Sequence, residues 1–136
     1  MTTVIVISTL LTVWIIYLRL KGTIQNRRAI GQKVILKYAD QNDSIAKELP
    51  RTGVIKEKIR IEKTDDNFVI KLDKPINFEN DDFNEVVIRH RHVGQYIGST
   101  KEIDVHLLIP RVSLAKDKYL TDDFSHVAWL TIKKAS

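Results

Sequence analysis

Two patterns of apolar and polar residues divide the chain into a helical part and a β-rich part. Residues 1–18 form an apolar run that contains no charged side chain. From Lys33 onward, apolar residues recur at every second position, which is the period of a strand with one buried face. The pattern therefore predicts an N-terminal helix followed by a β domain.

The alternation predicts short strands separated by turn residues and prolines. Turn-forming residues at 64–67 separate two of these strands into a hairpin, and the prolines at positions 75 and 110 each end a strand. A polar loop over Arg111–Asp123 is expected to hold one helical turn. The predicted strands are Lys33–Ala39, Val54–Lys63, one from Phe68 to before Pro75, Glu85–Val93, Ile103–Ile109 and His126–Lys133.

These elements predict one small all-β domain after a single transmembrane helix. About six short strands joined by turns are typical of an antiparallel barrel or sandwich. In one of the strands, Ile55, Ile59 and Ile61 are expected to share the buried face. We divide the chain into a transmembrane helix at 1–20, a basic juxtamembrane linker or frayed helix end at 21–32, and a β-rich soluble domain at 33–136.

The first segment has the features of a membrane anchor. A helix over residues 1–20, at ~1.5 Å per residue, matches the ~30 Å hydrocarbon core. Trp14 and Tyr17 lie near its charged end, where amphipathic rings favour the headgroups, and Arg19 can extend its guanidinium to the interface. A cleaved signal peptide is disfavoured, because no basic residue precedes the run and bulky residues follow it. A buried core helix is a further alternative, but an uncharged run of this length is unusual in a small soluble domain.

The positive charges are local and predict an orientation. Six of the 22 basic residues precede Asp40, the first acidic residue, and the remaining 16 are balanced by 17 acidic ones. Basic residues directly after a span favour the cytoplasmic side, so the β domain is expected in the cytoplasm. The compact size and the short N-terminal tail favour the cytoplasmic membrane of a bacterium. Four of them are expected at the membrane surface: Arg19, Lys21, Arg27 and Arg28. The nearly neutral β domain argues against nucleic acid as a partner.

The stretch VVIRHRHVG at 86–94 is the most distinctive motif. On a strand, His90 and His92 share one face with the apolar residues before them, and Arg89 and Arg91 share the other face, which we expect to be solvated. Two histidines in this spacing could hold a metal ion with His106 as a third ligand. However, the alternation places His106 on the opposite face. We therefore favour half-buried histidines that are hydrogen-bonded to backbone or water, and keep the metal site at His90 and His92 as the alternative.

Three residues of this region form the candidate partner-binding surface. Arg89 and Arg91 project side by side, and Tyr96 follows in a glycine-bounded loop. Arginine is enriched in protein interfaces because its planar group pairs with carboxylates. A nucleic-acid surface using the same residues is the less favoured alternative, since no RNA-binding signature is present.

Three similar turns, each with paired aspartates, precede predicted strands. They begin at Thr64, Asn80 and Thr121, and each leads to a phenylalanine. Paired aspartates could bind calcium, but the EF-hand spacing is absent. We favour turns stabilised by side-chain hydrogen bonds that bring each aromatic ring into the core.

The chemistry carried by the sequence favours a binding protein over an enzyme. The chain has no cysteine, which excludes disulfides and thiolate chemistry, and no Gly-x-Ser-x-Gly motif accompanies its serines and histidines. We therefore expect a membrane-anchored, non-catalytic interaction or scaffold module without a cofactor. Its expected partners are the bilayer and another protein of a membrane complex. A metal- or small-ligand-binding module is the alternative.

Overall fold

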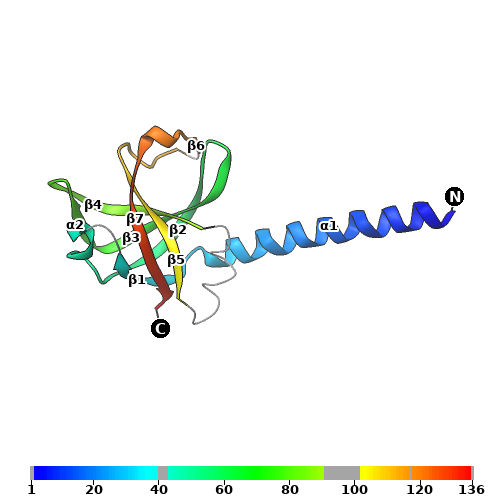
Figure 1. Cartoon of the computed structure of the whole chain (residues 1–136), viewed down its shortest axis with the longest axis horizontal. Helices are drawn as coiled ribbons and strands as arrows, with labels where there is room; N and C mark the ends of the chain where they lie inside the picture. The colour runs from blue at the N-terminus through cyan, green and yellow to red at the C-terminus, as the bar shows by residue number, and fades with distance from the viewer. Residues whose placement is uncertain (1, 40–42, 91–101, 117, 136) are drawn as a thin grey trace.

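The computed structural model shows a closed β-barrel from which one long helix projects (Figure 1). The structure describes residues 2–39, 43–90, 102–116 and 118–135, without the side chains of 2–5 and 19–28. The helices are α1 (Thr2–Ala29), α2 (Asp43–Ala46) and the 3-10 turn η1 (Thr121–Asp123). The strands are β1 (Lys33–Ala39), β2 (Arg51–Ile61), β3 (Thr64–Phe78), β4 (Asp81–Arg89), β5 (Ile103–Pro110), β6 (Lys118–Tyr119) and β7 (Phe124–Lys134).

Helix α1 extends well beyond the predicted anchor and ends against the barrel. It continues to Ala29, through most of the segment expected to be a linker or a frayed end. Ala29 is buried, and the Gly31 amide donates a hydrogen bond of 2.7 Å to the Ile55 carbonyl. Across the helical residues whose side chains are described, no helix is long and apolar enough to cross a membrane. The transmembrane helix at 1–20 therefore stays a prediction without structural support.

The barrel is an antiparallel meander, which confirms the barrel form of the predicted fold. Around it the strands follow the order β1-β7-β5-β4-β3-β2, and antiparallel pairing of β1 with β2 closes the circle. Strand β6 pairs in parallel with the end of β2 and extends the sheet outside the circle. The polar segment 111–123 contains the expected helical turn, η1.

Two buried clusters lie on opposite faces of the barrel wall. The larger one fills the interior and includes Phe68, Ile70, Val86 and Ile88. The second, which we call the outer cluster, uses the residues between them in sequence, so it lies on the outside. Its members are Ile59, Ile61, Val69, Val87, Leu108, Tyr119 and Phe124, with Leu114 packed against them. Leu114, Tyr119 and Phe124 therefore cover part of the outside of the barrel.

Strand β2 changes its buried face along its length. Its register with β3 shifts between Ile55 and Glu57, and beyond such a bulge alternate side chains point to the opposite side. Ile55 lies in the interior, whereas Ile59 and Ile61 belong to the outer cluster. The prediction that these three isoleucines share one face is therefore wrong, because a bulge leaves no mark on a period-two pattern.

Strand β3 passes both of its predicted limits. The chain turns at Glu62, which has a φ of 50°, so the predicted turn at 64–67 is already part of the strand. At the other end β3 runs through Pro75 to Phe78, with a register shift against β4 between Lys71 and Ile76. A proline is tolerated at such an irregularity because it need not donate a ladder hydrogen bond there.

The three aspartate-rich segments bring aromatic rings toward the hydrophobic clusters, as predicted. Phe68 and Phe124 are buried, and Phe83 packs partly buried against the interior cluster. Within the described ranges, no group of three or more histidine, aspartate or glutamate side chains is arranged to hold a metal ion.

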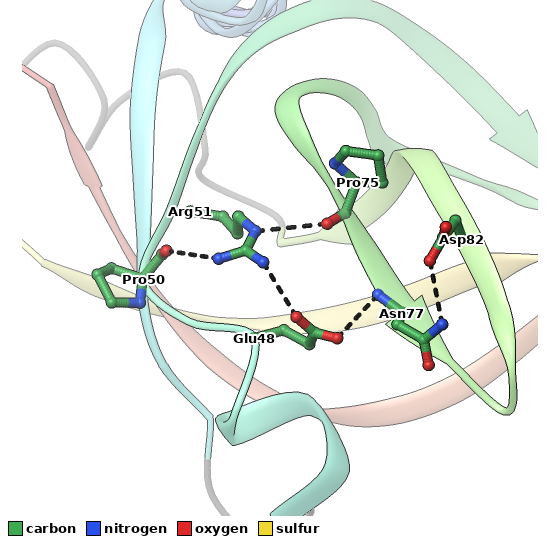
Figure 2. A network of polar contacts seen from close by, with 6 residues as sticks. All are labelled: Glu48, Pro50, Arg51, Pro75, Asn77 and Asp82. Atoms are coloured by element: carbon green, nitrogen blue, oxygen red, sulfur yellow. Dashed lines mark hydrogen bonds and ion pairs between the residues drawn. The ribbon is translucent and has the colours of Figure 1, made fainter.

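A polar network fixes the β3–β4 hairpin to the corner before β2 (Figure 2). The guanidinium of Arg51 donates to the carbonyl of Pro75 at 3.5 Å and forms an ion pair of 3.0 Å with Glu48. Glu48 also accepts a 3.1 Å hydrogen bond from the backbone N–H of Asn77, and the side-chain amide of Asn77 donates to Asp82 at 3.0 Å. The network therefore holds the start of β4 in place from one side.

Candidate functional site

The VVIRHRHVG motif falls at the end of β4, and only part of it is described. Val86 and Ile88 are buried in the interior, which confirms the predicted alternation. His90 follows the strand, and its amide donates a 3.2 Å hydrogen bond to the Asp66 carbonyl. The predicted partners Arg91, His92 and Tyr96 lie outside the described residues. The arginine surface and the His90–His92 metal site therefore stay predictions.

Arg89 lies on the outside of the barrel, but the face it shares is not simply solvated. Its Nε donates a 2.7 Å hydrogen bond to Asn67 Oδ1, and Asn67 is fully buried. The Asn67 side chain in turn donates to the Thr64 carbonyl at 3.0 Å. Val87, on the same face as Arg89, is buried in the outer cluster. The expectation of a solvated face is wrong at Val87, which packs against Tyr119 and Phe124.

His106 points outward, as the alternation predicted, and stacks on an exposed tryptophan. It pairs across the sheet with Arg89 on one side and Trp129 on the other. The centroids of the His106 and Trp129 rings are 3.7 Å apart, and the ring of His126 is 6.5 Å from that of His106. Cationic and aromatic side chains thus meet on the outside of β4, β5 and β7.

Acid should weaken the fold through His106. Burial, and then the charges of His126 on β7 and Arg89 on β4, lower the pKa of His106 from its ordinary value of 6.5. The unfolded chain therefore binds a proton at His106 at a higher pH than the folded chain does. The stabilisation is complete above the unfolded pKa and is lost as the pH falls through the folded pKa. We expect the Tm to fall as the pH is lowered below the ordinary histidine pKa of 6.5, and to fall less in His106→Gln. Equal losses in both proteins would remove His106 as a cause.

A wide cleft lies beside the first half of β4. This cleft, which we call the β4 groove, has a volume of about 550 Å³, within the range of ligand pockets. One wall is β4, and the other is the chain that leaves β5. The groove is lined by Lys56, Asp82, Phe83, Asn84, Glu85, Pro110, Arg111, Val112, Ser113, Leu114 and Ala115.

The groove exists because β4 and β5 separate after three residue pairs. They pair only at Val87–Leu108, Ile88–Leu107 and Arg89–His106. Continued in the same register, Ile109 would lie opposite Val86, and Pro110 would then lie opposite Glu85. The backbone N–H of His90 points to β3, where it donates a hydrogen bond to the Asp66 carbonyl. Backbone groups alternate in direction along a strand, so those of Arg89, Val87 and Glu85 point to β5. Proline has no N–H to donate there, so the ladder stops.

Residues 81–86 of β4 consequently have a described neighbouring strand on one side only. On that side they pair with β3, from Phe78–Asp81 to Ile70–Val86. No register with β5 includes them. The barrel thus presents a short open strand edge that faces the β4 groove.

Glu85 is the residue of the groove with an incomplete set of hydrogen bonds. Its Oε1 lies 3.1 Å from the ammonium of Lys56, and this hydrogen bond and the carboxylate charge raise the pKa of Lys56. Its Oε2 is buried and has no hydrogen-bond partner among the described residues. Leaving a buried acceptor unpaired costs about 1–3 kcal/mol, and more when the group is charged. The site is therefore suited to a ligand that donates a hydrogen bond to Glu85.

A second cleft of about 420 Å³ continues the groove toward the hairpin tip. The two clefts share Asp82, Phe83, Pro110 and Arg111. Arg111 is held in place because its Nε donates a 2.7 Å hydrogen bond to Ser125 Oγ. At the far end lie Glu79 and Asp81, which have no ion-pair partner in the described ranges. The continuous surface therefore ends in unneutralised negative charge.

Sequence reasoning did not find this groove. The one signal in the sequence is Pro110. The pattern predicts that it ends a strand, but not that it leaves the edge of β4 unpaired. Its consequence depends on the β4–β5 register, which the sequence pattern leaves open.

Comparison with known proteins gives no relative for this chain. No family model, no curated protein and no solved structure matches it. Its function is therefore inferred from its own residues.

Proposed function

We propose that this protein is a membrane-anchored, non-catalytic protein-interaction module that serves as an accessory subunit of a membrane complex. The observation that carries the proposal is the exposure of apolar side chains along α1. Between Val6 and Leu18, every large apolar side chain is 45–65% exposed, and the helix points away from the barrel (Figure 1). A helix that is apolar on all sides needs a non-aqueous environment or a protein partner to bury it.

The length and ends of this helix favour the bilayer as that environment. Residues 1–18 carry no charge, and Trp14 and Tyr17 are at the end nearer the barrel. Their ring centroids are 6.1 Å apart, and both rings are exposed, as expected for an aromatic anchor at the headgroups. Four basic residues follow this uncharged stretch and favour a cytoplasmic barrel: Arg19, Lys21, Arg27 and Arg28.

The barrel supplies the interaction part of the proposal. Its β4 groove combines apolar residues such as Val112 and Leu114 with charged ones such as Glu85 and Arg111. Such a mixture is typical of surfaces that bind peptides or other proteins. Held at the membrane, the barrel would meet membrane partners at a raised effective concentration.

Fractionation and protease protection of the full chain test this proposal. We expect the protein in the membrane fraction of bacterial cells after alkaline carbonate washing, since a spanning helix is not released by loss of charge contacts. The barrel should resist protease in spheroplasts and be cut in inverted vesicles. Release by carbonate would contradict the anchor, and cleavage in spheroplasts would contradict the orientation.

A further inference from the structure

We propose that the β4 groove binds an extended, basic peptide segment of a partner protein, which adds as a strand to the open edge of β4. This inference rests on the proposed function as an interaction module and names the chemistry of its partner. It is carried by the strand edge, the groove and the distribution of charge.

The strand edge determines the form of the ligand. Among the strands that the structure describes, residues 81–83, 85 and 86 pair with β3 alone, and alternation turns the backbone N–H and C=O of Glu85 toward the groove. An unpaired edge of this kind is completed by another extended chain, whose backbone supplies the missing hydrogen bonds. The edge is about as long as a typical strand of five or six residues, so it can accommodate one strand of a partner.

The edge is held ready for such a chain. Glu79 and Asn80 have φ values of 52° and 69°, as a tight two-residue turn between paired strands requires. The network in Figure 2 fixes the hairpin through Asn77 and Asp82. A rigid edge loses little conformational entropy when a peptide docks.

The charges of the groove select a basic peptide. The two clefts are lined by two cations, Lys56 and Arg111, and by four carboxylates, so their net charge is negative. Lys56 is paired with Glu85. The carboxylates of Glu79 and Asp81 have no ion pair within the described part of the chain, and Glu85 retains a buried oxygen without a donor. A lysine or arginine of the incoming strand would supply the missing donor to Glu85 and positive charge to the hairpin end.

The other side chains of the peptide would be apolar. Successive side chains of a strand point to opposite faces. If the basic residues of the peptide lie on one face, every second residue therefore lies on the other face. Phe83, which packs against the interior cluster, offers apolar surface on the face opposite to Glu85. Alternating basic and β-branched residues are therefore the expected pattern.

The test uses a synthetic peptide of alternating lysine and valine, about eight residues long, and the full chain in detergent. We expect saturable binding at low salt, with amide exchange of residues 81–86 slowed about tenfold or more. A peptide with glutamate in place of lysine should not bind, and neither should the lysine peptide with alternate backbone nitrogens methylated. Equal binding of the glutamate peptide, or binding without protection of 81–86, would overturn the proposal.

Two variants assign the charge contacts. Glu85→Gln should weaken binding of the lysine peptide about tenfold, because it removes a charge-assisted hydrogen bond. Glu79→Gln combined with Asp81→Asn changes only exposed side chains and should weaken binding several-fold at low salt but little at high salt. Glu102→Gln is the matched control, because Glu102 also pairs with a lysine, Lys37, but lies outside the groove. An equal effect of the control would overturn the assignment.

Two further outcomes separate this inference from the proposed function. If amide exchange of residues 81–86 slows with rising protein concentration in the absence of peptide, the groove binds a second copy of the chain. That result would overturn the proposal of a peptide ligand. A chain that is anchored in membranes but binds no lysine peptide would overturn the groove proposal alone. Because binding is measured in detergent, loss of the membrane anchor would leave this result unaffected.

Discussion

Gly53→Ala is expected to destabilise the barrel by about 3 kcal/mol, at the upper end of typical overpacking effects. Gly53 lies in β2, where it pairs with Val34 of β1 and Leu72 of β3. A methyl group at this position would lie 2.6 Å from Ile70 Cγ2 and 2.7 Å from the Lys71 carbonyl oxygen. The carbonyl belongs to the backbone of a closed barrel and cannot move away without disturbing its neighbours.

Urea unfolding of the full chain in detergent, followed by circular dichroism, measures this loss. Gly31→Ala is the matched control, because a methyl group there meets no atom within 4 Å, although φ is +88°. The control should lose about 1 kcal/mol from backbone strain alone. If both variants unfold at the midpoint of the parent protein, the close approach of β2 and β3 at Gly53 is refuted.

The period-two pattern predicted the barrel because it reports which residues are buried on a strand. It predicted β1 with its observed bounds, and the predicted limits of β5 and β7 lie within two residues of those observed. Apolar residues such as Phe68 and Ile70 then had to meet in one interior. Closure into a barrel was one of two predicted forms, and the pairing of β1 with β2 decides between them.

The same pattern gave wrong predictions where strand register, or a second layer of residues outside the barrel, determines which side chains are buried. The bulge after Ile55 reverses the face of Ile59, and β3 passes Pro75 because its pairing is irregular there. Val87 was expected on a solvated face, but it is buried in the outer cluster against Tyr119 and Phe124. These outcomes depend on contacts between residues far apart in the chain, which local alternation does not encode.

The candidate site was predictable only in part for the same reason. The alternation placed Arg89 and His106 on the outer face correctly. The β4 groove, in contrast, follows from the register that sets Pro110 against Glu85, and neither residue belongs to a recognisable motif. A proline at the end of one strand acquires meaning only when the neighbouring strand and its pairing are known.

Replacing Leu10 and Leu11 together by aspartate is expected to move the protein from the membrane fraction to the soluble fraction. Both side chains are exposed on α1, at 65% and 58%, and they lie near the middle of the proposed anchor. Each aspartate at the centre of a membrane helix costs about 2.5–3.5 kcal/mol, so the pair opposes insertion by roughly 5–7 kcal/mol. The measurement is the fraction of protein left in carbonate-washed membranes.

The matched control places the same two charges on the barrel. Tyr38 and Leu120 are 64% and 62% exposed, so Tyr38→Asp with Leu120→Asp adds equal charge to apolar positions outside α1. This control should stay in the membrane fraction, and circular dichroism should show folded β structure in both double variants. If the Leu10 and Leu11 variant also stays in washed membranes, α1 is not the anchor. Either a protein partner buries its apolar surface, or another part of the chain binds the membrane. If only that variant is released, α1 is the anchor, because net charge and the barrel fold are the same in the two proteins.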